Sequence, residues 1–323
     1  SALAWTETKS VAYPSVGLSA ILTDLLPIRS DVLTFLKLRG SYSEVGNAPT
    51  RYIAYQTHPY QSGTPSTTST YPNSDIKPER TKAWEVGLQS RFWGDKLALN
   101  VSLYKTSTFN QLFNPSLPSS SGYSSIYING GQVDNKGIEA SLSLSQALGP
   151  VEWNSTLTYT INRNKIKKLL KPTTLKDGLL VEQDMLDLDG VGNVKTRLFE
   201  GGSVGDLYVT ALRTDEHGYI DVDYVNNTVS VDGNAGERGD GWIYAGNSQA
   251  KYTMGWRNSF SWKGLTLGFL INARVGGVCV SMTQALMDSY GTSKATADAR
   301  DAGGVMINGY LVPAAQKYYQ TVG

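Results

Sequence analysis

This sequence of 323 residues has almost no cysteine, no long apolar run and no excess of either charge. Cys279 is the only cysteine, which excludes a disulfide framework and a CxxC pair for metal or redox chemistry. The 29 basic residues balance 28 acidic ones, so the sequence lacks the excess of positive charge that would indicate a nucleic-acid partner. No apolar stretch approaches the roughly 18 residues that a membrane-spanning helix needs. The sequence therefore disfavours a disulfide-stabilised fold, a transmembrane helix and nucleic-acid binding.

Motifs for catalysis and cofactor binding are equally scarce. The two histidines, His58 and His217, lack the HExxH context of a zinc site. No nucleophile elbow, Walker loop or dinucleotide fingerprint occurs. Asp184, Asp187 and Asp189 are spaced loosely like a calcium loop, but the closing glutamate is missing. We expect a solvated loop there, no metal site and no cofactor.

One acidic segment, Thr214–Asp223, offers a hypothesis of catalysis on polysaccharide. Its carboxylates, Asp215, Glu216 and Asp221, are conceivable as a general acid and base. The same segment has the pattern of a short hairpin centred on His217-Gly218. We favour the solvated turn and predict that the protein is not an enzyme.

Tyrosine and tryptophan dominate the aromatic content, with 19 Tyr and 7 Trp against 7 Phe. Both side chains combine an apolar ring with a polar tip, so they suit a boundary between lipid and water. The mean hydropathy is −0.26. These values are compatible with a soluble all-β protein and equally with a membrane β-barrel, whose strands are only half apolar.

Strict alternation of apolar and polar residues is the clearest signal in the chain. After Lys136, four apolar residues (Ile138, Ala140, Leu142, Leu144) alternate with Glu139 and serines, which is the period of a β-strand. Asn258 is the one clear break in the apolar series of its strand. The same alternation predicts four hairpins, at about 14–44, 82–107, 135–163 and 252–275.

The lengths of strands and connections favour a transmembrane barrel. The predicted strands run for roughly ten to twelve residues, enough for a tilted strand to cross the ~25 Å apolar band of an outer membrane. Turns within hairpins are short, whereas long loops lie between them, at about 44–81, 108–134, 164–251 and 276–323. Transmembrane barrels place short turns in the periplasm and long loops outside. We therefore predict an antiparallel transmembrane β-barrel; a soluble sandwich or propeller explains the alternation but not this segregation.

Six segments, in order, resemble the SusC/RagA family of TonB-dependent outer-membrane transporters. They are LKLRGSYSEVGN (36–47), DIKPERTKAWEVGLQSRFWGDKLALNVSLYK (75–105), SSGYSSIYINGGQVDNKGIEASL (120–142), EGGSVGDLY (200–208), YTMGWRNSFSWKGLTLGFLINARVGG (252–277) and YGTSKATADAR (290–300). The resemblance implies part of a 22-stranded barrel of the cell outer membrane, embedded in lipid and filled by a plug that couples to the TonB complex. It also implies a SusD-like surface lipoprotein as partner and the import of oligosaccharides or peptides in Bacteroides-type bacteria.

The two ends of the chain depart from the family pattern. Nothing before Val11 resembles a plug or a TonB box, and Thr321-Val322-Gly323 lacks the terminal aromatic residue of the last strand. We expect a C-terminal-half barrel fragment with eight strands, residues 1–323 forming one partial barrel domain.

Aromatic residues beside amide and hydroxyl groups in the long loops are the candidates for contact with cargo. Sugars pack their C–H faces on aromatic rings and need paired hydrogen bonds for their hydroxyls. The alternative is that these residues pack the loops onto the rim or onto a lid protein. The candidates are Tyr123, Tyr127 and Asn129 in one set and Trp242, Tyr244 and Asn247 in another.

Two function hypotheses follow. The first is a barrel fragment of a nutrient importer without catalytic residues. The second is a soluble β-rich glycan-binding or adhesin module, in which Leu97, Leu99, Val101 and Leu103 are buried against a second sheet.

Overall fold

A computed structural model describes most of the chain: residues 6, 10–28, 30–51, 53–55, 60–65, 69–117, 119–170, 173–174, 178, 180–181, 184–188, 190, 192–313 and 315–322. The chain divides into two compact units. The sheet unit comprises Ser1–Leu186, Phe199–Val204 and Ala250–Gly276. The loop unit comprises Asp187–Leu198, Gly205–Gln249 and Gly277–Gly323.

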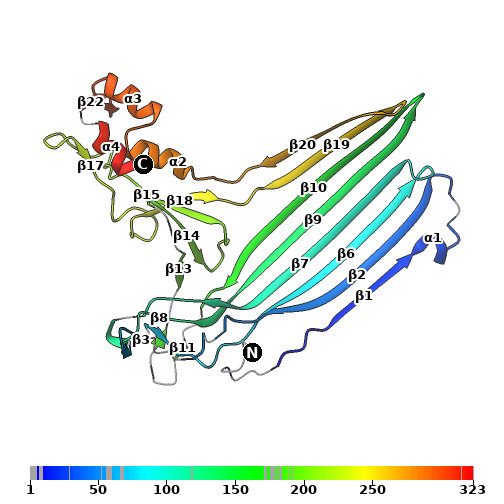
Figure 1. Cartoon of the computed structure of the whole chain (residues 1–323), viewed down its shortest axis with the longest axis horizontal. Helices are drawn as coiled ribbons and strands as arrows, with labels where there is room; N and C mark the ends of the chain where they lie inside the picture. The colour runs from blue at the N-terminus through cyan, green and yellow to red at the C-terminus, as the bar shows by residue number, and fades with distance from the viewer. Residues whose placement is uncertain are drawn as a thin grey trace. The chain divides into compact units, whose positions relative to one another are not determined.

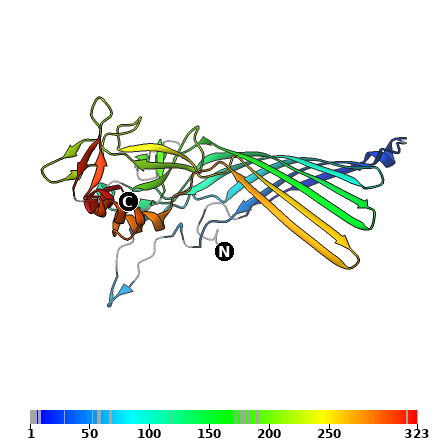
Figure 2. The ribbon, with the colours of Figure 1, turned by 90° about the horizontal axis from the view of Figure 1, so that it is seen from above.

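The sheet unit is built on one eight-stranded antiparallel sheet in which every strand pairs with its neighbour in the order β1-β2-β6-β7-β9-β10-β19-β20 (Figures 1 and 2). The order follows the sequence, so the sheet is an up-and-down meander without crossovers. The strands are β1 (Ser15–Ile21), β2 (Leu33–Asn47), β6 (Glu79–Phe92), β7 (Leu97–Phe113), β9 (Ile128–Leu148), β10 (Val151–Lys168), β19 (Tyr252–Trp262) and β20 (Leu265–Val275).

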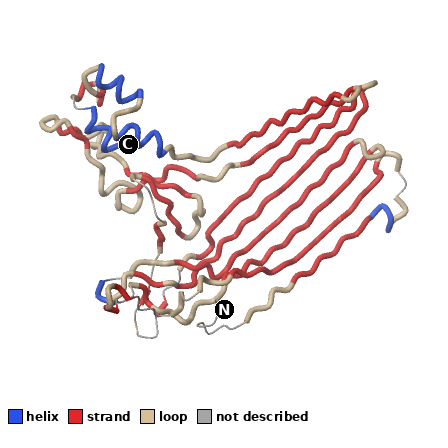
Figure 3. The backbone as a smooth tube through the Cα atoms, in the orientation of Figure 1, coloured by secondary structure: helices blue, strands red, loops and turns tan. Residues whose placement is uncertain are grey.

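The two ends of this sheet differ in their connections. At one end the strands join through tight turns, as Figure 3 shows, with positive φ at Gly149 (62°) and Gly264 (88°), where a side chain would be strained. The helix α1 (Leu22–Leu25) lies in the β1–β2 connection at this end. At the other end the connections are longer and comprise residues 48–78, 114–127 and 169–251. The eight predicted strands and the segregation of short turns from long connections are thus present.

Several strands are longer than the alternation of apolar residues predicted. β7 has 17 residues and β9 has 21, because the ladder continues through polar residues beyond the apolar part. Polar alternation such as Asn129 to Asn135 carries no hydropathy signal, so sequence reasoning ended these strands early.

The two faces of the sheet have opposite chemistry. We call the apolar face the side of the even-numbered residues of β1, β2, β6, β9 and β19 and the odd-numbered residues of β7, β10 and β20. Large hydrophobic side chains on it are exposed, including Leu18, Leu38, Val86, Leu103, Ile138, Leu142, Leu157, Trp256, Leu267 and Ile271. The polar face, on the opposite side, carries hydroxyls, amides and charges.

Asn258, the break in the apolar series, is buried on the apolar face, with 1 % of its surface exposed. The indole N–H of Trp153 donates to its Oδ1 at 3.0 Å. The Trp153 and Phe260 rings stack with centroids 6.1 Å apart, and Phe269 stands opposite Asn258 in the ladder. The asparagine therefore sits under aromatic rings with its carbonyl oxygen satisfied.

A small hydrophobic cluster closes the long-connection end of the sheet unit. It contains Leu117, Ile126, Ile128, Leu170 and Val181. Further short elements of the sheet unit are β3 (Tyr60–Gln61), β4 (Thr64–Pro65), β5 (Thr70–Tyr71), η1 (Ser119–Ser121), β8 (Ser125–Ile126), β11 (Thr173–Thr174) and β12 (Leu180–Val181).

The loop unit contains regular structure where the sequence predicted loops at 164–251 and 276–323. A four-stranded sheet has the order β13-β14-β15-β18, and a second cluster of Val222, Val229, Ile307 and Val312 lies among two small hairpins. The elements are β13 (Met185–Asp187), whose first two residues belong to the sheet unit, β14 (Val194–Phe199), β15 (Asp206–Thr210), β16 (Val222–Asp223), β17 (Thr228–Val229), β18 (Trp242–Asn247), α2 (Met282–Ser289), α3 (Lys294–Asp301), β21 (Val305–Ile307), β22 (Tyr310–Val312) and α4 (Ala315–Val322). Ser281 and Ser293 cap α2 and α3 through their hydroxyls. Within the described residues, no helix is long and apolar enough to cross a membrane.

Candidate functional site

The polar face of the sheet carries a hydrogen-bonded group centred on Arg39. Its Nη2 donates to Ser102 Oγ at 2.5 Å and pairs with Glu85 Oε1 at 3.2 Å. Both charged side chains are more than one third exposed, so the pair is screened by solvent. A cavity of about 300 Å³ adjoins Arg39 and Glu85. This face offers a solute charge and hydrogen-bonding groups.

Glycines let large side chains lie flat on this face. A Cβ added at Gly87 would lie 2.4 Å from Arg39 Nε, and one at Gly137 would lie 2.4 Å from both the Tyr104 ring and the Ile161 carbonyl oxygen. Close packing of this kind needs the absence of a side chain in the neighbouring strand.

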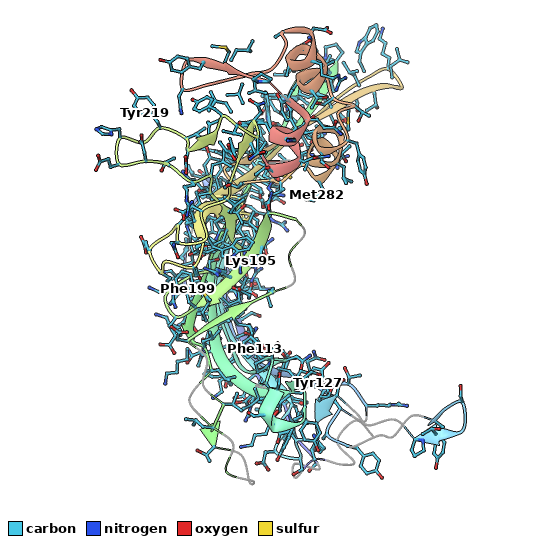
Figure 4. The ribbon with its side chains drawn as sticks, turned by 90° about the vertical axis from the view of Figure 1, so that its left-hand side faces the viewer. Phe113, Tyr127, Lys195, Phe199, Tyr219 and Met282 are labelled. Atoms are coloured by element: carbon cyan, nitrogen blue, oxygen red, sulfur yellow. The ribbon has the colours of Figure 1, made fainter. Side chains whose placement is uncertain are left out.

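The first predicted set lies where β8 and β9 begin, in the sheet unit. Figure 4 labels Tyr127 beside Phe113, which stands opposite Ile128 in the ladder. The Asn129 side chain bonds the Lys77 main chain in both directions, at 2.6 and 2.8 Å. Its amide also donates to the Asn110 carbonyl at 2.8 Å. Asn129 therefore fixes the chain before β6 to β7, and its hydrogen-bonding capacity is used internally.

The two tyrosines of this set also make contacts within the unit. The Tyr123 ring packs on Tyr71, with centroids 5.2 Å apart, and on the hydrophobic cluster. The Tyr127 carbonyl accepts from Asn73 Nδ2 at 2.9 Å. Both phenols remain partly exposed. These contacts favour the alternative that the residues pack the loops, rather than form an open binding surface.

The second predicted set lies on β18 in the loop unit. Tyr208 stands opposite Tyr244, and Thr210 stands opposite Trp242, so the two aromatic residues of β18 share one face. Asn247 Nδ2 donates to Asp206 Oδ1 at 2.8 Å, and the Tyr244 hydroxyl lies 3.4 Å from the same oxygen. Tyr244 is 56 % exposed, whereas Trp242 is half-buried. This arrangement leaves the Tyr244 ring open to a ligand.

Two cations that sequence reasoning missed complete this face. Lys195 Nζ, labelled in Figure 4, lies 3.8 Å from the Trp242 ring centroid. Arg197 is 3 % exposed and pairs with Asp187 Oδ1 at 2.9 Å and Asp240 Oδ2 at 2.7 Å. Its guanidinium carbon lies 5.5 Å from the Tyr208 ring centroid. The alternation of Lys195 and Arg197 with Thr196 and Leu198 could have predicted a strand with both cations on one face.

The tyrosines of this face hold their protons more tightly than usual. Burial, followed by the nearby Asp206 carboxylate, raises the pKa of both Tyr208 and Tyr244 above the ordinary tyrosine value. Both hydroxyls are therefore neutral at physiological pH and able to donate hydrogen bonds.

The acidic residues considered for catalysis or metal binding serve turns and ion pairs. Asp215 Oδ1 accepts from the main-chain N–H groups of His217 and Tyr219, each at 2.9 Å, which makes Thr214–Asp223 the predicted hairpin turn. Asp187 is bound by Lys195 and Arg197. His58 and Asp189 lie outside the described residues. Among the described residues, no group of three or more His, Cys, Asp or Glu is arranged to hold a metal ion.

Comparison with known proteins gives a family and a fold. The family model described as "TonB dependent receptor-like, beta-barrel" matches residues 3–272. "TonB-dependent receptor P3" of Formosa agariphila is 27% identical over 301 residues, covering 84% of this chain and 29% of that protein. "TonB-dependent receptor P26" of the same organism is 25% identical, covering 84% of this chain and 28% of that protein. This chain thus spans less than a third of the length of these relatives.

Solved structures agree on the fold. The RagAB peptide transporter superposes with a TM-score of 0.65 at 21% identity, covering 88% of this chain and 31% of that chain. The RagAB peptide importer in its "open-open" state gives a TM-score of 0.64, with 84% of this chain covered. The described eight-stranded sheet is therefore the fold of a segment of such a barrel wall.

Proposed function

This chain belongs to the TonB-dependent receptor-like β-barrel family of outer-membrane proteins, and we propose that it forms part of the wall of a nutrient importer. The observation that carries the proposal is the contrast between the two faces of the sheet. Exposed leucines on one face suit lipid, and the Arg39, Glu85 and Ser102 group on the other suits a polar lumen.

The soluble glycan-binding alternative loses its main support. It requires the leucines of β7 to be buried against a second sheet, but Leu103 is 50 % exposed. Among the described residues, no second sheet pairs its strands with the eight-stranded sheet. Within the sheet unit, no second sheet covers the leucines of β7. Family membership also places the protein in the outer membrane.

The cargo we propose is an oligosaccharide or a peptide, received together with a SusD-like surface lipoprotein and driven by the TonB complex. Support comes from RagAB, which is described as a peptide transporter, and from the segments that resemble the SusC/RagA family. Tyr244 is the residue that we assign to cargo contact, because its ring is exposed while its hydroxyl is held by Asp206. We assign Trp242 and Asn247 to shaping the surface around Tyr244 within the loop unit. We assign Tyr123, Tyr127 and Asn129 to packing the long connections within the sheet unit.

The test is uptake by cells that carry the full-length receptor. Deleting the receptor should abolish growth on one class of cargo, glycan or peptide, offered as the sole nutrient. The substitution Tyr244→Ala should then raise the cargo concentration needed for half-maximal uptake by about tenfold, the loss of one stacking contact. Tyr224→Ala, an equally exposed tyrosine of the loop unit, is the control and should leave uptake unchanged. Normal growth of the deletion strain on both classes would contradict the import proposal; equal uptake by the two variants would contradict the role of Tyr244.

A further inference from the structure

A row of three positive charges borders the apolar face on the side of the long connections. Lys105 of β7 stands opposite Lys136 of β9, and Lys136 stands opposite Arg163 of β10. All three side chains are exposed. Two residues nearer the tight turns, the same face presents Leu103 and Ile138, which are 50 % and 40 % exposed. This cation row (Lys105, Lys136, Arg163) therefore directly adjoins the apolar surface.

The sheet itself does not neutralise the cation row. In the described part of the chain, no carboxylate forms an ion pair with any of its three members. Arg163 Nη1 donates to the main-chain carbonyls of Asn162 and Lys251, at 3.1 and 2.7 Å, which leaves its charge uncompensated.

The acids near the row are engaged elsewhere or face away. Asp134 is two residues from Lys136 on the same face, where it stands opposite Lys165 and accepts from Gln132 at 2.9 Å. Glu139 belongs to the polar face. Like charges directly opposite one another in a sheet destabilise it, with Cβ atoms roughly 5 Å apart. Binding of an external anion to the row would relieve this repulsion.

We propose that the cation row binds phosphate groups of lipid headgroups in the outward-facing leaflet of the outer membrane. The position fits, because long connections lie on the outer side of such barrels and the row sits where the apolar band ends on that side. Trp84 stands opposite Lys105 and is 61 % exposed, as aromatic residues at the headgroup level are. Two neighbouring ammonium groups with a guanidinium at one end of the row match phosphate oxygens in charge and in hydrogen-bond donors.

The row lies on the lipid side of the sheet, so cargo that crosses a polar lumen does not meet it. This proposal therefore goes beyond nutrient import, and failure of the cargo assignment leaves it standing.

The experiment measures lipid binding to the full-length receptor in phosphatidylcholine nanodiscs. The probes are lipid A, a phosphorylated glycolipid, and the same lipid after removal of its phosphates; bound copies are counted by native mass spectrometry. The receptor should bind phosphorylated lipid A at least tenfold more tightly than the dephosphorylated lipid, and added salt should reduce the difference. Equal binding of the two lipids overturns the proposal without any variant.

Variants locate the site. Replacing the row with Lys105→Gln, Lys136→Gln and Arg163→Gln should abolish the preference for phosphate, whereas Lys105→Arg, Lys136→Arg and Arg163→Lys should keep it. A control removes three exposed charges elsewhere, with Lys96→Gln, Lys263→Gln and Lys294→Gln, and should bind as the unmodified protein does. Unchanged binding by the glutamine variant overturns the assignment to this row. If inorganic phosphate bound to the detergent-solubilised receptor with the affinity of lipid A, the proposal that the bound phosphate belongs to a lipid would be wrong.

Discussion

The two faces of the eight-stranded sheet use the same strands for opposite purposes. On the apolar face, Leu142 is 40 % exposed and Leu267 is 68 % exposed, and no described strand or helix of the sheet unit packs over them. On the polar face, neighbouring side chains bond one another, as Ser143 and Thr156 do at 3.1 Å. A water-soluble sheet hides one face in a core, but here both faces are open. The difference indicates two solvents, lipid on one side and water on the other.

The largest expected effect comes from placing the same charge on each face in turn. Leu142 belongs to the middle of the apolar band, and Ser141 is its sequence neighbour on the polar face. Leu142→Lys in the full-length receptor should lower the free energy of unfolding in lipid vesicles by about 2–4 kcal/mol, the cost of a lysine near the bilayer centre. Ser141→Lys should change it by less than ~1 kcal/mol. Denaturant unfolding measures both, and equal losses would remove the distinction between the faces.

A second effect comes from tight packing on the polar face. Gly137→Ala places a methyl group against the Ile161 carbonyl oxygen and the Tyr104 ring, and should cost about 1–3 kcal/mol. Gly268→Ala, on the same face, is the control, because its added Cβ would meet the Asn258 carbonyl oxygen at an ordinary 3.6 Å. The same unfolding measurement applies. A neutral Gly137→Ala would mean that the polar face is loosely packed there.

A third effect concerns Asn258, the polar side chain that is buried on the apolar face. Trp153→Phe keeps an aromatic side chain but removes the five-membered ring with the N–H that bonds Asn258 Oδ1. Loss of this hydrogen bond should cost about 1–2 kcal/mol because the oxygen is buried. Trp262→Phe, at the strand end and 45 % exposed, should cost less than Trp153→Phe. If the two variants unfold alike, the Trp153–Asn258 bond contributes nothing to stability.

Sequence reasoning succeeded where one chemical pattern determined the structure. Apolar alternation, as in Ile138 to Leu144, fixed the strands and the lipid-facing side, and the tight turns followed from pairs such as Gly149-Pro150. It failed where partners came from distant segments. The ion pairs of Arg197 join residues of three different segments, and the Asn129 amide is used by main-chain groups 19 and 52 residues away. The hydropathy pattern also did not predict the helices α2 to α4, which are short and lie in a range without apolar alternation.

The most direct test of the central claim compares Ser141 and Leu142, two neighbours that point to opposite sides. Single cysteines at these positions, in a Cys279→Ser receptor reconstituted in lipid, would carry a nitroxide label, and its relaxation by oxygen and by a water-soluble nickel complex would be measured. Our account predicts that oxygen, which concentrates in lipid, dominates at Leu142→Cys and that the nickel complex dominates at Ser141→Cys. Strong relaxation by the nickel complex at both positions would contradict it, because both faces would then be in water.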